Sequence, residues 1–114
     1  MTGKDATMTW AAICRYDDLL PERGVAALVG DVQVALFRCH DGQLFALGNR
    51  DPFTGTCVLA RGIVGSRAGR RTVASPLHKQ VFDLRTGECL DAEGVTVPVY
   101  EVRSREGMVE VNAT

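Results

Sequence analysis

Apolar and polar residues alternate over short segments of the chain, and this period of two predicts β-strands rather than helices. In the first half, strands are predicted at residues 10–14, 25–29, 32–38 and 44–47. The pairs Gly30-Asp31 and Asp41-Gly42 are tight-turn signals between the last three strands, which therefore form an antiparallel meander. Residues 16–20 have room for a single helical turn before a proline ends it.

The middle of the chain is different, because residues 48–74 contain five glycines and show little periodicity. A loop region of this length in a small domain is usually functional or a binding surface. Only short strands are predicted within it, at residues 63–64 and 72–73, and further strands follow at 80–84, 97–103 and 108–111. Turn signals recur about every ten residues, so the pattern predicts an all-β fold, a small antiparallel sandwich or open barrel with long loops.

Length and composition are those of one globular domain, with 114 residues of which 46% are hydrophobic and 24% charged. We expect residues 1–8 to form a flexible N-terminal tail and residues 9–114 a single domain. No apolar run approaches the roughly 18 residues of a membrane span, and the first nine residues carry no signal-peptide pattern. These features predict a cytoplasmic protein without a membrane partner.

Charge is uneven although the net charge is only −1, because residues 61–85 carry a net charge of +5. Eleven of the 13 basic residues are arginines, so the codon usage of a GC-rich genome is one explanation. A surface that docks an acidic partner is the other. Nucleic-acid binding is not expected, because the stretch lacks the interleaved aromatic residues on which bases stack.

The four cysteines show no close pairing, since Cys14, Cys39, Cys57 and Cys89 lie 18 or more residues apart. Zinc and iron–sulfur sites usually draw on C-x-x-C pairs, and disulfides need an oxidising compartment. We therefore interpret the cysteines as buried free thiols. Cys57 lies in a predicted loop and is the best candidate for an exposed thiol.

Residues 75–87 read S-P-L-H-K-Q-V-F-D-L-R-T-G and resemble the second cluster-binding loop of Rieske proteins, C-P-x-H-G-x-x-F-D-x-x-T-G. The first loop of that family reads C-x-H after a strand, and Asn49-Arg50-Asp51 stands in its place here. The resemblance covers the strand order from Trp10 to Val111. It implies a Rieske-like iron–sulfur protein (ISP) fold.

The resemblance breaks at the cluster ligands, because a Rieske [2Fe–2S] centre needs two thiolates on one iron and two imidazoles on the other. Asn49 and Ser75 stand at the thiolate positions, and Asp51 and His78 at the imidazole positions. An amide and a hydroxyl are poor substitutes for soft anionic sulfur. We expect a Rieske-like domain with no cluster, no metal site and no catalytic residues.

A cluster-free chain of this length with D-P-F at residues 51–53, A-R-G-I-V-G at 60–65 and S-P-L-H-K-Q-V-F-D-L is similar to the small subunits of assimilatory NAD(P)H-dependent nitrite reductases. The resemblance implies a non-catalytic subunit that docks on a large subunit. In that family the large subunit carries FAD, a [4Fe–4S] cluster and sirohaem, and reduces nitrite to ammonium with NAD(P)H. We expect docking through the two loops and the basic stretch, and the candidate residues are Arg61, Arg67, Arg70, Arg71, His78 and Lys79. Two alternatives stay open: a Rieske-type [2Fe–2S] ferredoxin with atypical ligands, and a free-standing binding or sensor module.

Individual roles follow from the chemistry of these side chains. Ser75 is predicted to close its loop by bonding backbone amides, and Asp51 and Asp83 to structure theirs. Phe82 is predicted to lie in the core. For His78 three roles are open: a hydrogen bond to backbone within its loop, contact with a partner, or metal binding with Asp51.

Overall fold

The computed structural model describes residues 10–113 and shows that the predicted all-β class is confirmed. Nine strands are present in this range: β1 (Ala11–Arg15), β2 (Arg23–Val29), β3 (Val32–Arg38), β4 (Leu44–Gly48), β5 (Ile63–Arg67), β6 (Arg70–Ala74), β7 (Val81–Asp83), β8 (Val99–Arg105) and β9 (Met108–Asn112). The helical elements there are two single 3-10 turns, η1 (Tyr16–Asp18) and η2 (Leu59–Arg61), so none is long enough to cross a membrane. The predicted tail of residues 1–8 lies outside the described residues.

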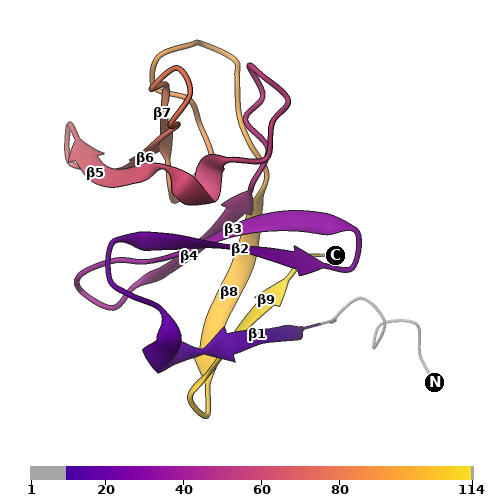
Figure 1. The fold of residues 1–114 in the computed structure, drawn as a ribbon. Helices are drawn as coiled ribbons and strands as arrows, with labels where there is room; N and C mark the ends of the chain where they lie inside the picture. The colour runs from indigo at the N-terminus through magenta and orange to yellow at the C-terminus, as the bar shows by residue number, and fades with distance from the viewer. Residues whose placement is uncertain (1–9, 114) are drawn as a thin grey trace.

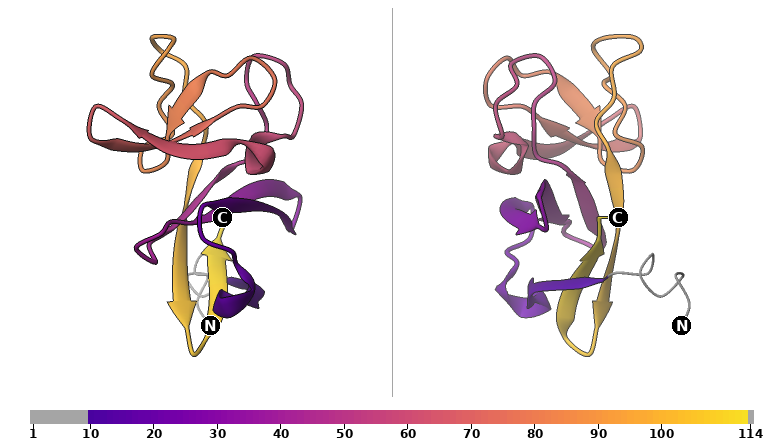
Figure 2. Two further views of the ribbon diagram at one scale, coloured as in Figure 1. Left: turned by 60° about the vertical axis from the view of Figure 1, so that its left-hand side comes forward. Right: turned by 90° about the vertical axis from the view of Figure 1, so that its right-hand side faces the viewer.

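The strands form two antiparallel sheets that are stacked end to end along the molecule (Figure 1). The large sheet has six strands in the order β1-β9-β8-β4-β3-β2, and the small sheet has the order β5-β6-β7. The chain leaves the large sheet after β4, builds the small sheet with its loops, and returns through β8, as both views of Figure 2 show. The predicted meander is confirmed as β2-β3-β4.

Strand β3 is buried on both faces, which explains why it holds the two parts of the molecule together. Val34 and Leu36 belong to one core cluster, inside the large sheet with Val109 and others. Ala35 and Phe37 belong to a second cluster, which also contains Leu59, Val73 and Phe82 of the small part. Burial of apolar side chains is the main stabilising contribution, so the two parts share one central strand.

Two predicted boundaries are corrected by the structure. Residues 48–74 are less irregular than their glycine content suggests, because β5 and β6 form a regular five-pair hairpin within them. The strand predicted at residues 97–103 begins two residues later, at Val99. Val97 donates its N–H to Gly87 O instead of extending the strand, and Pro98, which has no N–H, marks the strand's beginning.

We predict that Gly24→Ala is destabilising because β2 passes very close to η2 at this point. A Cβ atom on Gly24 would lie 2.2 Å from Ala60 O and 2.6 Å from Phe37 Cε1. Such overpacking costs about 1–3 kcal/mol of unfolding free energy, measured by urea denaturation. The control is Gly65→Ala on β5, whose Cβ would meet only Thr72 Oγ1, at 3.8 Å. Equal stability losses for the two variants would contradict this packing.

Candidate functional site

Two loops at the end of the small sheet hold the positions that correspond to cluster ligands in Rieske proteins. The first loop (residues 49–57) follows β4, and the second loop (residues 75–80) connects β6 to β7. Asn49, Asp51 and Ser75 are almost completely buried, with at most 2% of each residue exposed. His78 is exposed at the turn of the second loop. The structure therefore buries three of the four positions and leaves one at the surface.

A buried hydrogen bond joins the two loops directly. Ser75 Oγ donates to Asp51 Oδ2 at 2.5 Å, across 24 residues of sequence. The other carboxyl oxygen, Asp51 Oδ1, accepts the N–H of Phe53 at 2.8 Å. Leu77 N–H also donates to Ser75 Oγ, at 3.4 Å. The predicted bond of Ser75 to a backbone amide is therefore confirmed, but it is the longer of the two contacts. The bond to Asp51, which the sequence analysis did not predict, is the shorter one.

Asn49 orients the next element rather than the second loop. Its Oδ1 accepts the N–H of Ala60 at 2.7 Å, and its backbone oxygen accepts the N–H of Leu59 at 3.0 Å. These bonds satisfy two donors at the beginning of η2, where a helical turn has no internal partners for its N–H groups. Leu59 and Ala60 are thereby fixed in the core.

The second loop is a tight turn closed by its own backbone. Lys79 N–H donates to Ser75 O at 3.0 Å, and Ser75 N–H donates to Gln80 O at 2.9 Å. Lys79 occupies the position of the Rieske-loop glycine and has φ +62°, a left-handed conformation that glycine adopts more easily. Within residues 10–113 the His78 side chain has no hydrogen-bond partner, so the predicted bond of His78 to backbone is not formed.

These residues do not fit a Rieske cluster. The ligand set offers one imidazole and no thiolate, and the cluster family requires two of each. Two of the four ligand positions, Ser75 and Asp51, are also hydrogen-bonded directly to each other. Elsewhere in the described residues no three His, Cys, Asp or Glu side chains are grouped to hold a metal ion.

Three of the arginines proposed for docking are engaged within the chain. Arg67 pairs with Asp91 at 2.8 Å, and Arg71 pairs with Asp41 at 2.7 Å. Arg70 bridges Asp83 at 2.6 Å and Glu88 at 2.7 Å. Asp83 also accepts the N–H groups of Arg85 and Thr86, which confirms its predicted role in structuring its loop. The positive charge of this stretch is therefore largely balanced by acidic residues nearby in the fold.

The loops present an exposed apolar surface that the sequence analysis missed. We call Pro52, Phe53, Pro76, Leu77, His78 and Lys79 the loop tip. Phe53 is 41% exposed and Leu77 46% exposed. The Phe53 ring packs on Phe82, with centroids 6.3 Å apart, and Phe82 is fully buried as predicted. The sequence does not show whether an apolar residue in these loops is buried or exposed. The apolar surface of the loop tip is therefore recognised only from the exposed fractions of its side chains in the structure.

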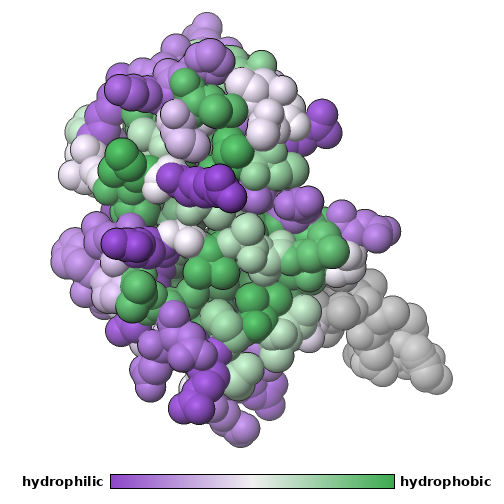
Figure 3. Space-filling view, viewed as in Figure 1, coloured by the Kyte–Doolittle hydropathy of each residue, from purple (hydrophilic) through white to green (hydrophobic). Residues whose placement is uncertain are grey.

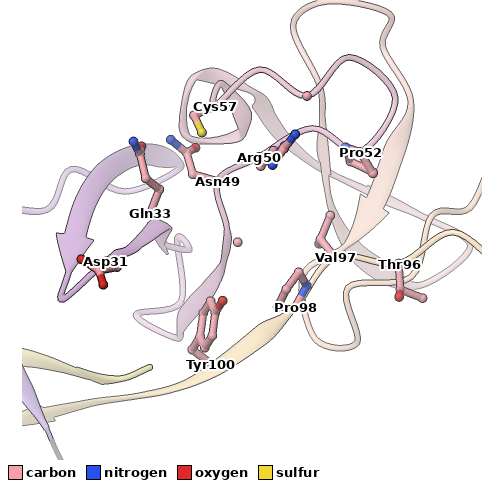
Figure 4. Close-up of a pocket in the computed structure, with 12 residues that line it drawn as sticks. Asp31, Gln33, Asn49, Arg50, Pro52, Cys57, Thr96, Val97, Pro98 and Tyr100 are labelled. Carbon is pink, nitrogen blue, oxygen red and sulfur yellow. The ribbon is translucent and has the colours of Figure 1, made fainter. Parts of the chain in front are cut away.

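A pocket of about 540 Å³ lies between the first loop, the β2–β3 turn and the beginning of β8 (Figure 4). Its lining includes Asp31, Gln33, Arg50 and Tyr100, which have mixed chemistry. Cys57 also lines it and is exposed, as predicted, whereas Cys39 and Cys89 are buried free thiols. Burial is the main cause that raises the pKa of Cys39, so this thiol is a weak nucleophile.

Comparisons with known proteins agree with this geometry. Residues 9–112 match the model of the Rieske-like [2Fe-2S] domain. The chain is 48% identical over 103 residues to the NADH nitrite reductase small subunit of Escherichia coli K12, covering 90% of this chain and 95% of that protein. A crystal structure described as an NADH-dependent nitrite reductase small subunit of Mycobacterium tuberculosis has a TM-score of 0.88 at 52% identity, covering 90% of this chain and 93% of that one.

A third relative is larger. The chain is 39% identical over 102 residues to part of the NAD(P)H nitrite reductase large subunit of Klebsiella oxytoca, covering 90% of this chain and 11% of that protein. The chain belongs to the family of Rieske-like [2Fe-2S] domains and, within it, to the small subunits of NADH nitrite reductases. The predicted Rieske-like fold is confirmed.

We predict that Ser75→Ala lowers the free energy of unfolding by about 1–3 kcal/mol, because a fully buried oxygen of Asp51 loses its donor. Chemical denaturation measures the change. Thr54→Ala is the control, since Thr54 Oγ1 accepts an N–H in the same loop but is exposed. A double-mutant cycle of Ser75→Ala with Asp51→Ala should show coupling, and strictly additive losses would contradict the bond.

We predict that Asp91 makes stability pH-dependent. The Val81 N–H at 2.9 Å, followed by the Arg67 guanidinium, lowers the pKa of Asp91 below its ordinary value of 3.8. This stabilisation is complete above pH 3.8 and is lost as the pH falls through the lower folded-state pKa. Asp91→Asn should reduce stability at neutral pH and flatten the acid limb of the curve of melting temperature against pH. The exposed Asp17→Asn is the control, and an identical acid limb in both variants would contradict the prediction.

Proposed function

We propose that this chain is a small, non-catalytic subunit that docks on the large catalytic subunit of an NAD(P)H-dependent nitrite reductase of nitrate and nitrite assimilation. The observation that carries the proposal is the buried Ser75–Asp51 bond, which links two Rieske loops with protein side chains where relatives of the wider family bind metal. The identity of the enzyme is inferred from the relatives that are named as nitrite reductase small subunits.

The proposal assigns the redox groups to the partner. FAD, a [4Fe–4S] cluster, sirohaem and the NAD(P)H site would belong to the large subunit, which reduces nitrite to ammonium in the cytoplasm. This chain would bind neither nucleic acid nor membrane. The Klebsiella oxytoca large subunit supports the partnership, because a segment like this chain forms part of the same polypeptide there.

The loop tip is the docking surface that the structure favours. Binding energy at protein interfaces concentrates in a few apolar or aromatic anchors surrounded by polar groups, and Phe53 and Leu77 offer such anchors. His78 and Lys79 beside them are exposed, with no ion pair to other described residues. Arg67, Arg70 and Arg71 already have acidic partners, so their release for docking would require breaking these ion pairs.

The proposal is tested by co-expressing the chain with a candidate large subunit and measuring complex formation and nitrite-dependent NAD(P)H oxidation. We predict that Leu77→Asp weakens the complex at least about tenfold, equivalent to about 1.4 kcal/mol, because a charge replaces an apolar anchor. Ile63→Asp is the matched control, because Ile63 is 76% exposed and lies on β5 outside the loop tip.

Two outcomes would contradict parts of this account. Undiminished co-purification of the Leu77→Asp variant would contradict docking through the loop tip. If charge reversal of Arg67, Arg70 and Arg71 abolished binding while the isolated variant stayed folded, the arginine stretch would be the docking surface. Full enzyme activity without this chain, and no complex with it, would contradict the subunit assignment itself.

A further inference from the structure

Strand β2 forms an open edge of the large sheet, and β3 is its only strand partner among residues 10–113. Its seven residues pair with β3 in an unbroken register, and none is charged between Gly24 and Val29. The opposite edge is different, since the pairing of β1 with β9 is interrupted by a register shift between Ala12 and Cys14. Bulges and charges protect sheet edges from pairing with other chains, and β2 has neither along this stretch.

The outward backbone groups of β2 can be assigned from its neighbours. Asn49 N–H donates to Gln33 O, so the backbone of Gln33 bonds toward β4 and not toward β2. Leu28 is the β2 partner of Gln33, and its N–H and C=O therefore point away from the sheet. By alternation, the same holds for Ala26. Within residues 10–113 neither residue has a backbone partner outside the strand ladder.

Apolar side chains accompany this edge. Leu28 is 68% exposed, Val25 is 36% exposed, and Ala26 is exposed as well. Figure 3 shows apolar surface across the middle of the molecule, in the region where Figure 1 places β1 and β2. An unprotected edge with an apolar surface is suited to accepting another strand.

We propose that the β2 edge pairs with the β2 edge of a second copy of this chain, antiparallel about a two-fold axis at Ala27. Outward-facing residues must meet outward-facing residues, so Ala26 pairs with Leu28 of the second copy and Leu28 with its Ala26. Each Leu28 side chain then covers the small side chain opposite. The outward backbone groups of Ala26 and Leu28 in the two copies satisfy each other in this way.

The charged residues at the two ends of β2 favour a second copy of this chain as the partner, and they favour this register. The same pairing brings Arg23, at the beginning of β2, beside the turn that follows Val29 and holds Asp31, twice by symmetry. Both residues are exposed, and neither forms an ion pair with other described residues. A shift by two residues would place Arg23 opposite the uncharged Val29 in one direction and beyond the turn that ends β2 in the other, so neither shift gives Arg23 a partner of opposite charge on that edge.

Sedimentation velocity over a concentration series, with amide hydrogen exchange by NMR, tests the proposal on the isolated full chain. We expect reversible dimerisation, with the N–H groups of Ala26 and Leu28 becoming protected only in the dimer. Leu28→Lys should remain monomeric at every concentration, because it places a buried charge at the interface. Val99→Lys, at an exposed apolar position on β8 in the interior of the sheet, should dimerise like the unmodified chain.

A charge swap tests the register. Arg23→Asp or Asp31→Arg alone should raise the dissociation constant several-fold, and the double variant should restore it. A chain that stays monomeric at every concentration overturns the proposal. If the N–H groups of Ala26 and Leu28 are protected only by the large subunit and not by dimerisation, the proposal is overturned as well. Dimerisation unchanged by Leu28→Lys, or single reversals that the swap does not rescue, overturns the β2 pairing.

Discussion

The hydrogen bond between Ser75 and Asp51 is the constraint on which the arrangement of the two loops depends. It joins segments 24 residues apart, and both partners are inaccessible to solvent. A polar pair in such a place must be satisfied, because a buried group without a partner costs more than a good hydrogen bond contributes. The pair therefore fixes the first loop to the second at one point. The backbone bonds of each loop then determine the rest of its shape.

This arrangement explains how the proposed docking surface is supported. The loops of the fold come together because the core beneath them requires it: Phe82, Leu59 and Phe37 pack in one cluster under both loops. Once the loops are held by side chains, their outer residues are free to present an apolar surface. Phe53 connects the core to the exposed surface of the loops, because its ring packs on Phe82 while part of it remains exposed. A rigid surface loses little conformational entropy on binding, which favours recognition.

Sequence patterns predicted most of the strands and the meander, but they did not predict the side-chain contacts between the loops. The meander β2-β3-β4 was predictable because tight turns separate clear alternations, and residues 75–87 placed the second loop. The first loop had no ligand residues to mark it, and only its position after a strand indicated it. That Asp51 would bond Ser75 could not be predicted, since the pairing depends on how two loops pack rather than on either loop alone. The same applies to the arginines, whose acidic partners Asp41 and Asp91 lie outside the basic stretch.

The central proposal is that protein side chains, in place of a metal cluster, join these loops. Iron and acid-labile sulfide, measured in freshly isolated protein prepared without oxygen, test it most directly. The account predicts neither element above background, together with no visible absorption band. Stoichiometric iron and sulfide would contradict it, and the chain would then be an electron carrier with unusual ligands.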